Sequence, residues 1–168
     1  MWVLRHAKAA SQGPDDHSRV LTARGRRQAA AVGNQLAAGP VPGAETPRLV
    51  LSSSARRAVQ TAELVVAALE DHVELVVERA LYSADADDVV EIMRGLDDDV
   101  ASVMVVGHNP TMHELALGLL DGEDTEGKAR LEGGFPTAAL AVTAVPAGSW
   151  PAVSLGSATL LALRTPDV

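Results

Sequence analysis

Hydrophobic residues in this chain follow two patterns that alternate along it. Short apolar runs at 2–4, 48–51, 73–77 and 102–106 are typical of buried β-strands. Between these runs, apolar residues recur at every third or fourth position, which predicts amphipathic helices. The expected inner faces are Ala29, Val32 and Leu36 in the first helix, Ala58, Ala62, Val65 and Leu69 in the second, Val89, Ile92, Met93 and Leu96 in the third, and Met112, Leu115, Ala116, Leu119 and Leu120 in the fourth.

The last third of the chain predicts two further strands and little helix. The stretch 121–132 is charged and contains glycine, which favours an exposed loop. Residues 137–145 and 159–164 are interpreted as the last two strands. Because no long helix separates these two, we expect one of them to run antiparallel at the edge of the sheet.

Strands that alternate with helices indicate an α/β fold, with helices on both faces of a largely parallel sheet. We therefore predict a three-layer α/β/α sandwich with about six strands. The 168 residues, 47% of them hydrophobic, suffice for a single domain spanning 1–168.

Composition restricts the possible functions. The formal net charge of −8 argues against a nucleic-acid partner, although a local cationic pocket for one phosphate stays possible. No run is long enough to span a bilayer and no secretory leader is visible, so we expect a cytoplasmic protein without a membrane partner. The chain contains no cysteine, no Asp-rich magnesium motif and no His-x-x-x-His cluster. We expect neither a metal nor another cofactor.

Arginine and histidine side chains follow three of the predicted strands within a few residues. Arg5 and His6 follow the first strand, Arg56 comes after the second and a run of serines, and His108 follows the fourth. Ligands of open α/β sheets bind at the carboxyl ends of the strands. We therefore expect these four residues to enclose one shared site.

The chemistry of this set suits a phosphoryl group. A guanidinium is always charged and presents a planar fork that matches phosphate oxygens. Two of them neutralise the charge that spreads over the equatorial oxygens during phosphoryl transfer. A neutral imidazole can act as the nucleophile, and neighbouring cations lower its pKa and keep it neutral. A second imidazole can donate a hydrogen bond to a nonbridging oxygen.

Several motifs together resemble the histidine phosphatase superfamily, whose fold is that of phosphoglycerate mutase. They are Leu4-Arg5-His6-Ala7-Lys8, Leu21-Thr22-x-x-Gly25, Ser52-Ser53-x-x-Arg56 with Thr61 after it, and Gly107-His108-Asn109-Pro110. The Arg-His-Ala-Lys form, the small size and Phe135-Pro136-Thr137-Ala138 resemble the SixA-like phosphohistidine phosphatase branch. The likeness runs from Trp2 to about Val145.

The resemblance implies a role for each of the four residues. His6 would be the nucleophile and would carry a covalent phosphohistidine. Arg5 and Arg56 would clamp the phosphate, and His108 would hydrogen-bond the phosphoryl oxygens and stabilise the transition state. Water would then release inorganic phosphate.

One part of the superfamily pattern has no clear counterpart here. Many relatives carry a carboxylic acid that protonates the leaving oxygen, and the nearest candidates in this chain are Glu78 and Asp85. A sugar alkoxide needs such a proton donor, whereas imidazole, with a pKa of about 6.5, leaves more easily. The predicted substrate is therefore phosphohistidine in a phosphorylated protein.

Other interpretations remain open at this stage. The chain could be a small-molecule phosphatase of the same superfamily that acts on a small phosphate ester, or a non-catalytic phosphate- or phosphoprotein-binding module. Arg56 could be an ordinary helix residue that pairs with Glu63. For its neighbour Arg57, we favour the interpretation as an ordinary helix arginine. Asp16 and Arg19 could organise the pocket rim through a salt bridge or form a solvated pair. His17, His72 and His113 are interpreted as structural or exposed.

Overall fold

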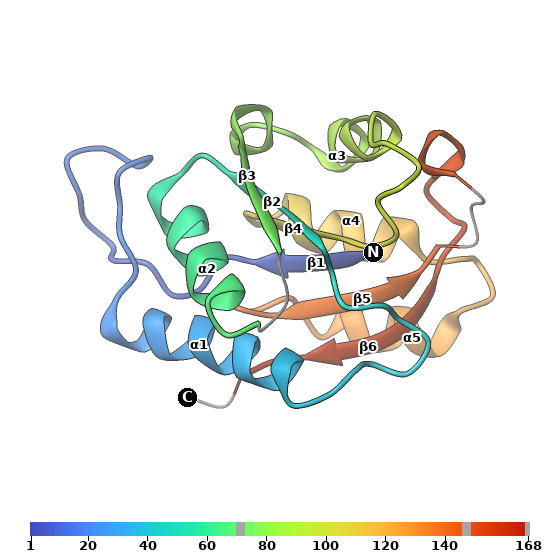
Figure 1. Ribbon diagram of the computed structural model, residues 1–168, viewed down its shortest axis with the longest axis horizontal. Helices are drawn as coiled ribbons and strands as arrows, with labels where there is room; N and C mark the ends of the chain where they lie inside the picture. Colours follow the sequence, from blue (N-terminus) through green and yellow to red (C-terminus); the bar gives the residue numbers. More distant parts are fainter. Residues whose placement is uncertain (70–72, 146–148, 167–168) are drawn as a thin grey trace.

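The computed structural model describes residues 1–69, 73–145 and 149–166 of the chain (Figure 1). Its described residues form a six-stranded sheet in the order β3-β2-β4-β1-β5-β6. The strands are β1 (Trp2–Arg5), β2 (Leu49–Ser53), β3 (Glu74–Glu78), β4 (Val103–Gly107), β5 (Leu140–Ala144) and β6 (Thr159–Arg164). Pairing is parallel from β3 through β2 and β4 to β1, whereas β5 pairs antiparallel with both β1 and β6.

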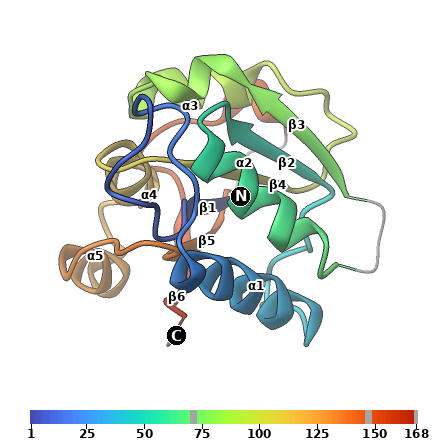
Figure 2. The same cartoon turned by 90° about the vertical axis from the view of Figure 1, so that its left-hand side faces the viewer.

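Helices cover both faces of this sheet, as Figures 1 and 2 show. They are α1 (Ala23–Ala37), α2 (Arg56–Val66), α3 (Ala86–Arg94), α4 (Thr111–Leu119) and α5 (Thr125–Glu132), with the short 3₁₀ turns η1 (Arg79–Tyr82) and η2 (Trp150–Ala152). Helices α1 and α2 pack on one face, and α3 and α4 pack on the other.

Alternation along the central strands divides the buried residues between two cores. In β4, Val103 and Val105 face the core under α3 and α4, while Met104 and Val106 face the core under α1 and α2. Successive side chains of a strand point to opposite faces, so a strand covered on both sides is apolar at every position. This is why residues 103–106 are all hydrophobic.

The predicted α/β/α sandwich is confirmed, with two local differences. The stretch predicted as a loop at 121–132 contains α5, which buries little besides Gly127 and Leu131. The helix therefore has no apolar periodicity to reveal it. The strand that runs antiparallel to its neighbours is β5, which lies inside the sheet. The edge strand is β6, which pairs with β5.

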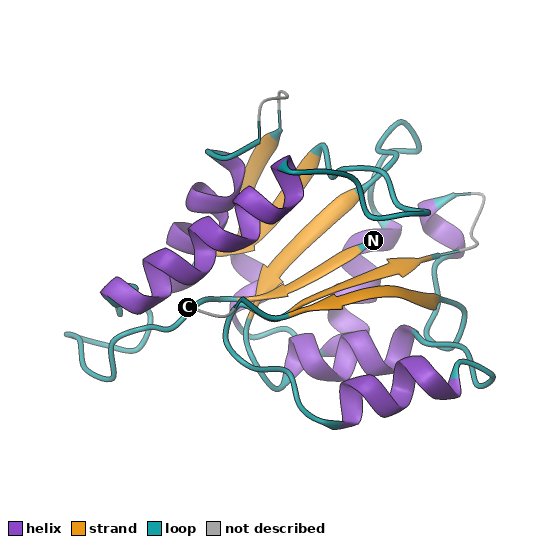
Figure 3. Cartoon of the chain, turned by 90° about the horizontal axis from the view of Figure 1, so that it is seen from below, coloured by secondary structure: helices purple, strands orange, loops and turns teal. Residues whose placement is uncertain are grey.

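The carboxyl ends of β1, β2 and β4 lie side by side, since these strands are neighbours in the sheet and parallel to one another. The view in Figure 2 shows the loop after β1, drawn in blue, together with the start of α2. Figure 3 shows how loops connect the strands to the surrounding helices. None of the helices in the described part of the chain is long and apolar enough to cross a membrane.

Candidate active site

A pocket of about 390 Å³ opens at the carboxyl ends of the central strands. Its lining combines cations and imidazoles with a single carboxylate among the described residues. The lining residues are Arg5, His6, Lys8, Ala9, Asp16, Arg19, Arg57, His108, Asn109 and Thr137. Arg5, His6 and His108 thus converge as the sequence predicts. The pocket carries local positive charge although the chain as a whole is acidic.

The hydrogen bonds of His6 determine which of its ring nitrogens is free to react. Its Nδ1 lies 2.8 Å from the carbonyl oxygen of Ala7, which can only accept, so Nδ1 carries the proton. Its Nε2 lies 3.2 Å from Nε of Arg57, which can only donate, so Nε2 presents its lone pair. Burial, together with the nearby guanidinium groups of Arg57 and Arg5, lowers the pKa of His6 to about 4. The ring is therefore neutral at physiological pH.

Arg57, and not Arg56, is the arginine that α2 contributes to the pocket, which corrects the sequence prediction. The side chain of Arg56 is 51% exposed and lies 4.0 Å from Glu63, whereas that of Arg57 is 6% exposed. Adjacent helix residues point about 100° apart, so only one of the pair can face the site. Arg57 lies one turn before buried Thr61, whose Oγ1 donates to the Arg57 carbonyl oxygen and accepts the N–H of Ala7.

Asp16 anchors two arginines of the pocket. Its carboxylate accepts hydrogen bonds from Arg19 at 2.6 Å, from Arg57 at 3.0 Å and from the hydroxyl of Tyr82 at 2.9 Å. Its carbonyl oxygen also accepts from Nη1 of Arg57 at 2.6 Å. The contacts with Arg19, Tyr82 and Arg57 hold the pKa of the carboxyl group well below its usual range. Asp16 thus stays ionised and positions cations.

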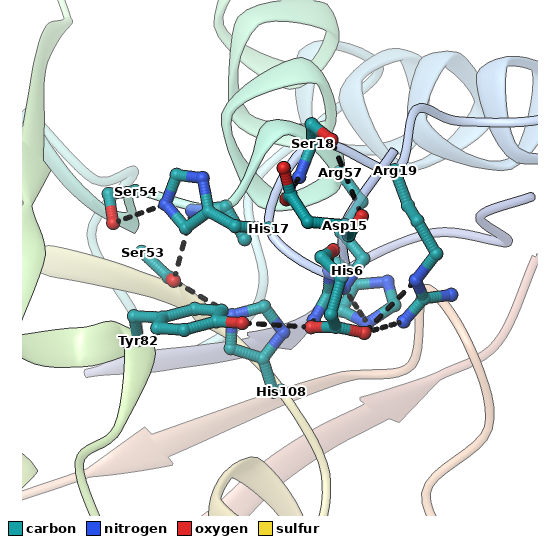
Figure 4. A network of polar contacts seen from close by, with 12 residues as sticks. His6, Asp15, His17, Ser18, Arg19, Ser53, Ser54, Arg57, Tyr82 and His108 are labelled. Carbon is teal, nitrogen blue, oxygen red and sulfur yellow. Dashed lines mark hydrogen bonds and ion pairs between the residues drawn. The ribbon is translucent and has the colours of Figure 1, made fainter. Parts of the chain in front are cut away.

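His108 faces His6 across the pocket, with their ring centroids 5.2 Å apart (Figure 4). Its Nε2 lies 2.7 Å from Oγ of Ser53, and its buried Nδ1 has no hydrogen-bond partner among the described residues. Oγ of Ser53 accepts the N–H of Ala55 and still has a hydroxyl proton and a second lone pair. When this hydroxyl donates to Nε2 of His108, the imidazole proton lies on Nδ1. Burial and the proximity of His6 and Arg57 lower the pKa of His108 to about 3.

Arg5 is fixed by the segment that leads into β5. Its Nη1 donates to the carbonyl oxygen of Phe135 at 2.8 Å, and the same oxygen accepts from Asn109 at 3.0 Å. Nε of Arg5 is buried without a partner among the described residues. Ala138 adopts a left-handed φ of 62°, and its N–H reaches the carbonyl oxygens of both Arg5 and His6 at 3.2 Å. This conformation attaches the segment to the end of β1.

Neither carboxylate expected as a proton donor lines the pocket. Oε1 of Glu78 accepts the N–H of Ala80 and caps η1. Asp85 caps α3 in a capping box with Asp88, in which each side chain accepts the other residue's N–H. Both carboxylates cap helices that follow β3 and lie outside the pocket lining. The structure therefore does not support their assignment as possible acids.

Comparison with known proteins identifies the family. Residues 1–94 match the model of the histidine phosphatase superfamily, branch 1. The chain belongs to this superfamily. It is also 38% identical over 169 residues to an uncharacterised protein of Mycobacterium leprae, an alignment that covers 97% of this chain and 99% of that protein.

Solved structures of SixA proteins are similar to this chain. The SixA protein of Agrobacterium tumefaciens, assigned to the phosphohistidine phosphatases, is 32% identical with a TM-score of 0.77. The alignment covers 98% of this chain and 96% of that one. A SixA protein histidine phosphatase in complex with tungstate is 27% identical with a TM-score of 0.76, covering 98% of this chain and 95% of that one. These similarities confirm the SixA-like resemblance and support phosphatase activity.

Several residues of the site were missed from the sequence alone. Arg57 could have been found from its spacing, because it lies four residues before Thr61 and eight before Val65 on the inner face of α2. Ser53 ends β2, two residues beyond the predicted run 48–51, and nothing in the sequence distinguishes it from its serine neighbours. Tyr82 carries no motif at all. Asp16 and Arg19 form a salt bridge, one of the two interpretations that the sequence left open, and Arg57 also pairs with Asp16.

The remaining histidines lie outside the pocket lining or outside the described residues. Nε2 of His17 contacts Oγ of Ser54, and its ring lies edge-on to Tyr82 at the rim. His113 stacks on Phe135 and contacts the carbonyl oxygen of Leu131, a structural role that agrees with the prediction. His72 lies outside the described residues.

A second pocket of about 350 Å³ lies near Trp2, Ser102 and Thr143, at the opposite end of the sheet. Its charged side chains are those of Glu45 and Asp98, which would repel a phosphate, and the N-terminal amino group of Met1 in its lining already donates to the carbonyl oxygen of Thr143. In the described part of the chain, no three His, Cys, Asp or Glu side chains are grouped so that they could hold a metal ion. The phosphate-compatible chemistry is therefore concentrated in the pocket around His6.

Proposed function

We propose that the protein is a phosphatase that uses Nε2 of His6 as its nucleophile and acts on phosphohistidine in proteins. The observation that supports this most is the arrangement at Nε2: its lone pair is oriented by the Nδ1 contact and lies against the guanidinium of Arg57. A neutral nucleophile surrounded by cations is suited to attack an anionic phosphoryl group.

Two buried donors without partners among the described residues complete the anion site. Nε of Arg5 and Nδ1 of His108 are both buried in the pocket walls. A buried polar group without a hydrogen bond costs free energy, and a phosphoryl oxygen would supply the acceptor that each lacks. Arg5, Arg57 and His108 would then donate to the nonbridging oxygens as charge shifts onto them.

The reaction proceeds in two displacements. The lone pair of Nε2 attacks phosphorus, and the bond from phosphorus to the substrate nitrogen breaks with its electron pair on that nitrogen. A water oxygen then attacks the phosphoryl group on His6, the phosphorus–Nε2 bond breaks, and the electron pair returns to Nε2. The water supplies one oxygen to inorganic phosphate and releases one proton to phosphate or solvent.

The lack of an available acid supports phosphohistidine over an alkyl ester. Asp16 is the carboxylate of the described pocket lining, and its bonds to Arg19, Arg57 and Tyr82 keep it ionised. It therefore cannot protonate an alkoxide. A phosphoimidazole that enters protonated on its other ring nitrogen leaves as neutral imidazole, and it needs no proton from the enzyme.

Turnover of a generic aryl phosphate in the presence of EDTA separates an enzyme from a binding module. We expect release of inorganic phosphate that vanadate inhibits and that EDTA does not abolish. A protein that retains vanadate or phosphate but releases no product would be a phosphate-binding module instead.

The substrate class requires a direct comparison. A histidine-phosphorylated protein and a panel of sugar phosphates are offered to the same preparation at matched concentrations. We expect kcat/KM to be much higher for the phosphohistidine protein. Faster hydrolysis of one of the small esters would instead assign the chain to the small-molecule phosphatases of the superfamily.

A further inference from the structure

One oxygen of Asp16 links Tyr82 to the arginine beside the nucleophile. Oδ2 of Asp16 accepts the hydroxyl of Tyr82 at 2.9 Å and Nη2 of Arg57 at 3.0 Å. Tyr82 belongs to η1, whereas Asp16 belongs to the loop after β1. The contact therefore ties the far side of the pocket rim to the loop that carries Asp16.

The position of Asp16 determines the direction in which the Nε–H group of Arg57 points. Nη1 donates to the Asp16 carbonyl oxygen, Nη2 donates to its carboxylate, and Nε donates to Nε2 of His6 at 3.2 Å. The guanidinium is planar and its donors form a rigid fork. Fixing the two terminal nitrogens on Asp16 thus fixes the direction in which Nε points.

The ring of Tyr82 also touches the second histidine of the pocket (Figure 4). It lies edge-on to His108, with centroids 5.7 Å apart and an interplanar angle of 89°, and its other neighbour is the ring of His17 at 4.9 Å. One side chain therefore contacts both halves of the site: the Asp16–Arg57 pair through its hydroxyl and His108 through its ring.

We propose that Tyr82 is a positioning residue, which holds Asp16 and through it directs Arg57 onto Nε2 of His6. Its effect on rate rests on the proposed function, whereas the alignment of Arg57 on His6 does not. Tyr82 is 38% exposed and the buried residue of η1 is Leu81 at 4%. Leu81 therefore attaches η1 to the core, and the hydroxyl of Tyr82 is available for a role at the site.

The first test measures the pKa of His6 by NMR titration of its ring in wild type and in Tyr82→Phe, without any phosphate present. The phenylalanine keeps the ring and removes the hydroxyl. The positive charge of Arg57 contributes to the lowered pKa of His6. When Asp16 is less firmly held, Arg57 moves away from His6 more often, so the pKa of His6 should rise in the variant.

A matched pair of loop variants identifies the route. Asp16→Asn weakens the contact to Arg57, whereas Asp15→Asn alters a carboxylate that accepts the N–H of Ser18. Tyr82→Phe and Asp16→Asn should each lower kcat on an aryl phosphate about tenfold, the scale of one hydrogen bond to a charged group. Because both act through the same oxygen, the double variant should lose little more than the worse single variant. Asp15→Asn should retain the wild-type kcat.

The two readouts distinguish this proposal from the proposed function. An unchanged His6 pKa in Tyr82→Phe, in a variant that unfolds like wild type, overturns the positioning role whatever the activity. Multiplicative losses in the double variant overturn it as well. A raised His6 pKa in a protein that hydrolyses no phosphate would support the positioning role and overturn the proposed phosphatase.

Discussion

Nε of Arg57 donates a hydrogen bond to Nε2 of His6 across 3.2 Å, so one guanidinium lies directly against the lone pair of the proposed nucleophile. A phosphoryl group that approaches Nε2 meets this cation at the same place. Nε of Arg57, which donates its hydrogen bond to the neutral imidazole, can then donate to a phosphoryl oxygen instead as the bond between Nε2 and phosphorus forms. Positioning and charge neutralisation, the two main contributions to phosphoryl transfer, thus depend on the same side chain.

Arg57 and Arg56 provide a matched pair for testing this relationship. Arg57→Ala should lower kcat on an aryl phosphate by about 10²–10³-fold, the cost of losing a preorganised transition-state donor. Arg56→Ala removes an exposed partner of Glu63 and should leave kcat unchanged. Its effect on the free energy of unfolding should stay below about 1 kcal/mol, as for most surface ion pairs.

A larger loss of kcat in Arg56→Ala than in Arg57→Ala would instead assign Arg56 to the site. Steady-state kinetics of both variants, alongside thermal unfolding to confirm that each is folded, decides between them. Arg57→Ala also releases its contacts with Asp16, so folding of that variant must be confirmed before its rate is interpreted.

His6→Ala should abolish turnover and covalent labelling while leaving the fold intact. The side chain lies beyond the end of β1, and its Nδ1 contact is to the adjacent residue, so little packing depends on it. When the reaction with a substrate labelled on its phosphoryl group is quenched within the first turnovers, the wild-type protein should carry a label that is labile in acid and stable in alkali. Persistent label on the variant would place the nucleophile elsewhere.

The sequence predicts the strands and the placement of Arg5, His6 and His108 because buried parallel strands produce continuous apolar runs. The polar residues directly after such runs must reach the carboxyl edge of the sheet. The choice between Arg56 and Arg57 requires the rotation of α2 about its axis. That rotation is set by packing of Ala58, Ala62 and Val65 against the sheet.

Other features depend on contacts between segments far apart in the sequence. Asp16 and Tyr82 are 66 residues apart, and neither carries a local pattern that predicts the other. Glu78 and Asp85 are the nearest candidate acids in the sequence, but carboxylates also stabilise helix starts, and each of these two caps a helix in the structure. Helix α5 was missed because its buried side is very narrow.

The lowered pKa of His6 predicts an unusual pH dependence of activity. The proposed nucleophile His6 must be neutral to attack, and its pKa of about 4 lies below the ordinary 6.5. kcat/KM, corrected for the ionisation of the substrate, should therefore stay level as the pH falls from 7 to about 5 and decline only near 4. A decline centred at about 6.5 would show that burial and the arginines do not control this ring.

The same shift predicts how stability depends on pH. Between about 4 and 6.5, the imidazole of His6 is protonated in the unfolded chain but not in the folded one. The unfolded state then binds more protons, so acidification through this range should lower the free energy of unfolding. Urea unfolding at several pH values measures this slope. The slope should be smaller in His6→Ala, and an equal slope would assign the effect to other groups.

Gly25 in α1 approaches the loop after β1 so closely that any side chain must disturb it. A Cβ at this position would lie 2.0 Å from the carbonyl oxygen of Lys8, which also accepts the N–H and the hydroxyl of Thr22. Gly25→Ala should therefore force α1 and the loop apart, with a loss of about 1–3 kcal/mol in the free energy of unfolding. Because Lys8 follows His6 and Ala7, kcat should fall as well.

Gly39→Ala is the control for this substitution, because a Cβ there meets nothing within 4 Å. Urea unfolding and aryl phosphate turnover of both variants test the difference. We expect Gly39→Ala to match wild type in both measurements. A Gly25→Ala variant with wild-type stability and kcat would mean that α1 can move away from Lys8 freely. In that case the close approach of helix and loop would not be what holds the end of β1, and His6 with it, in place.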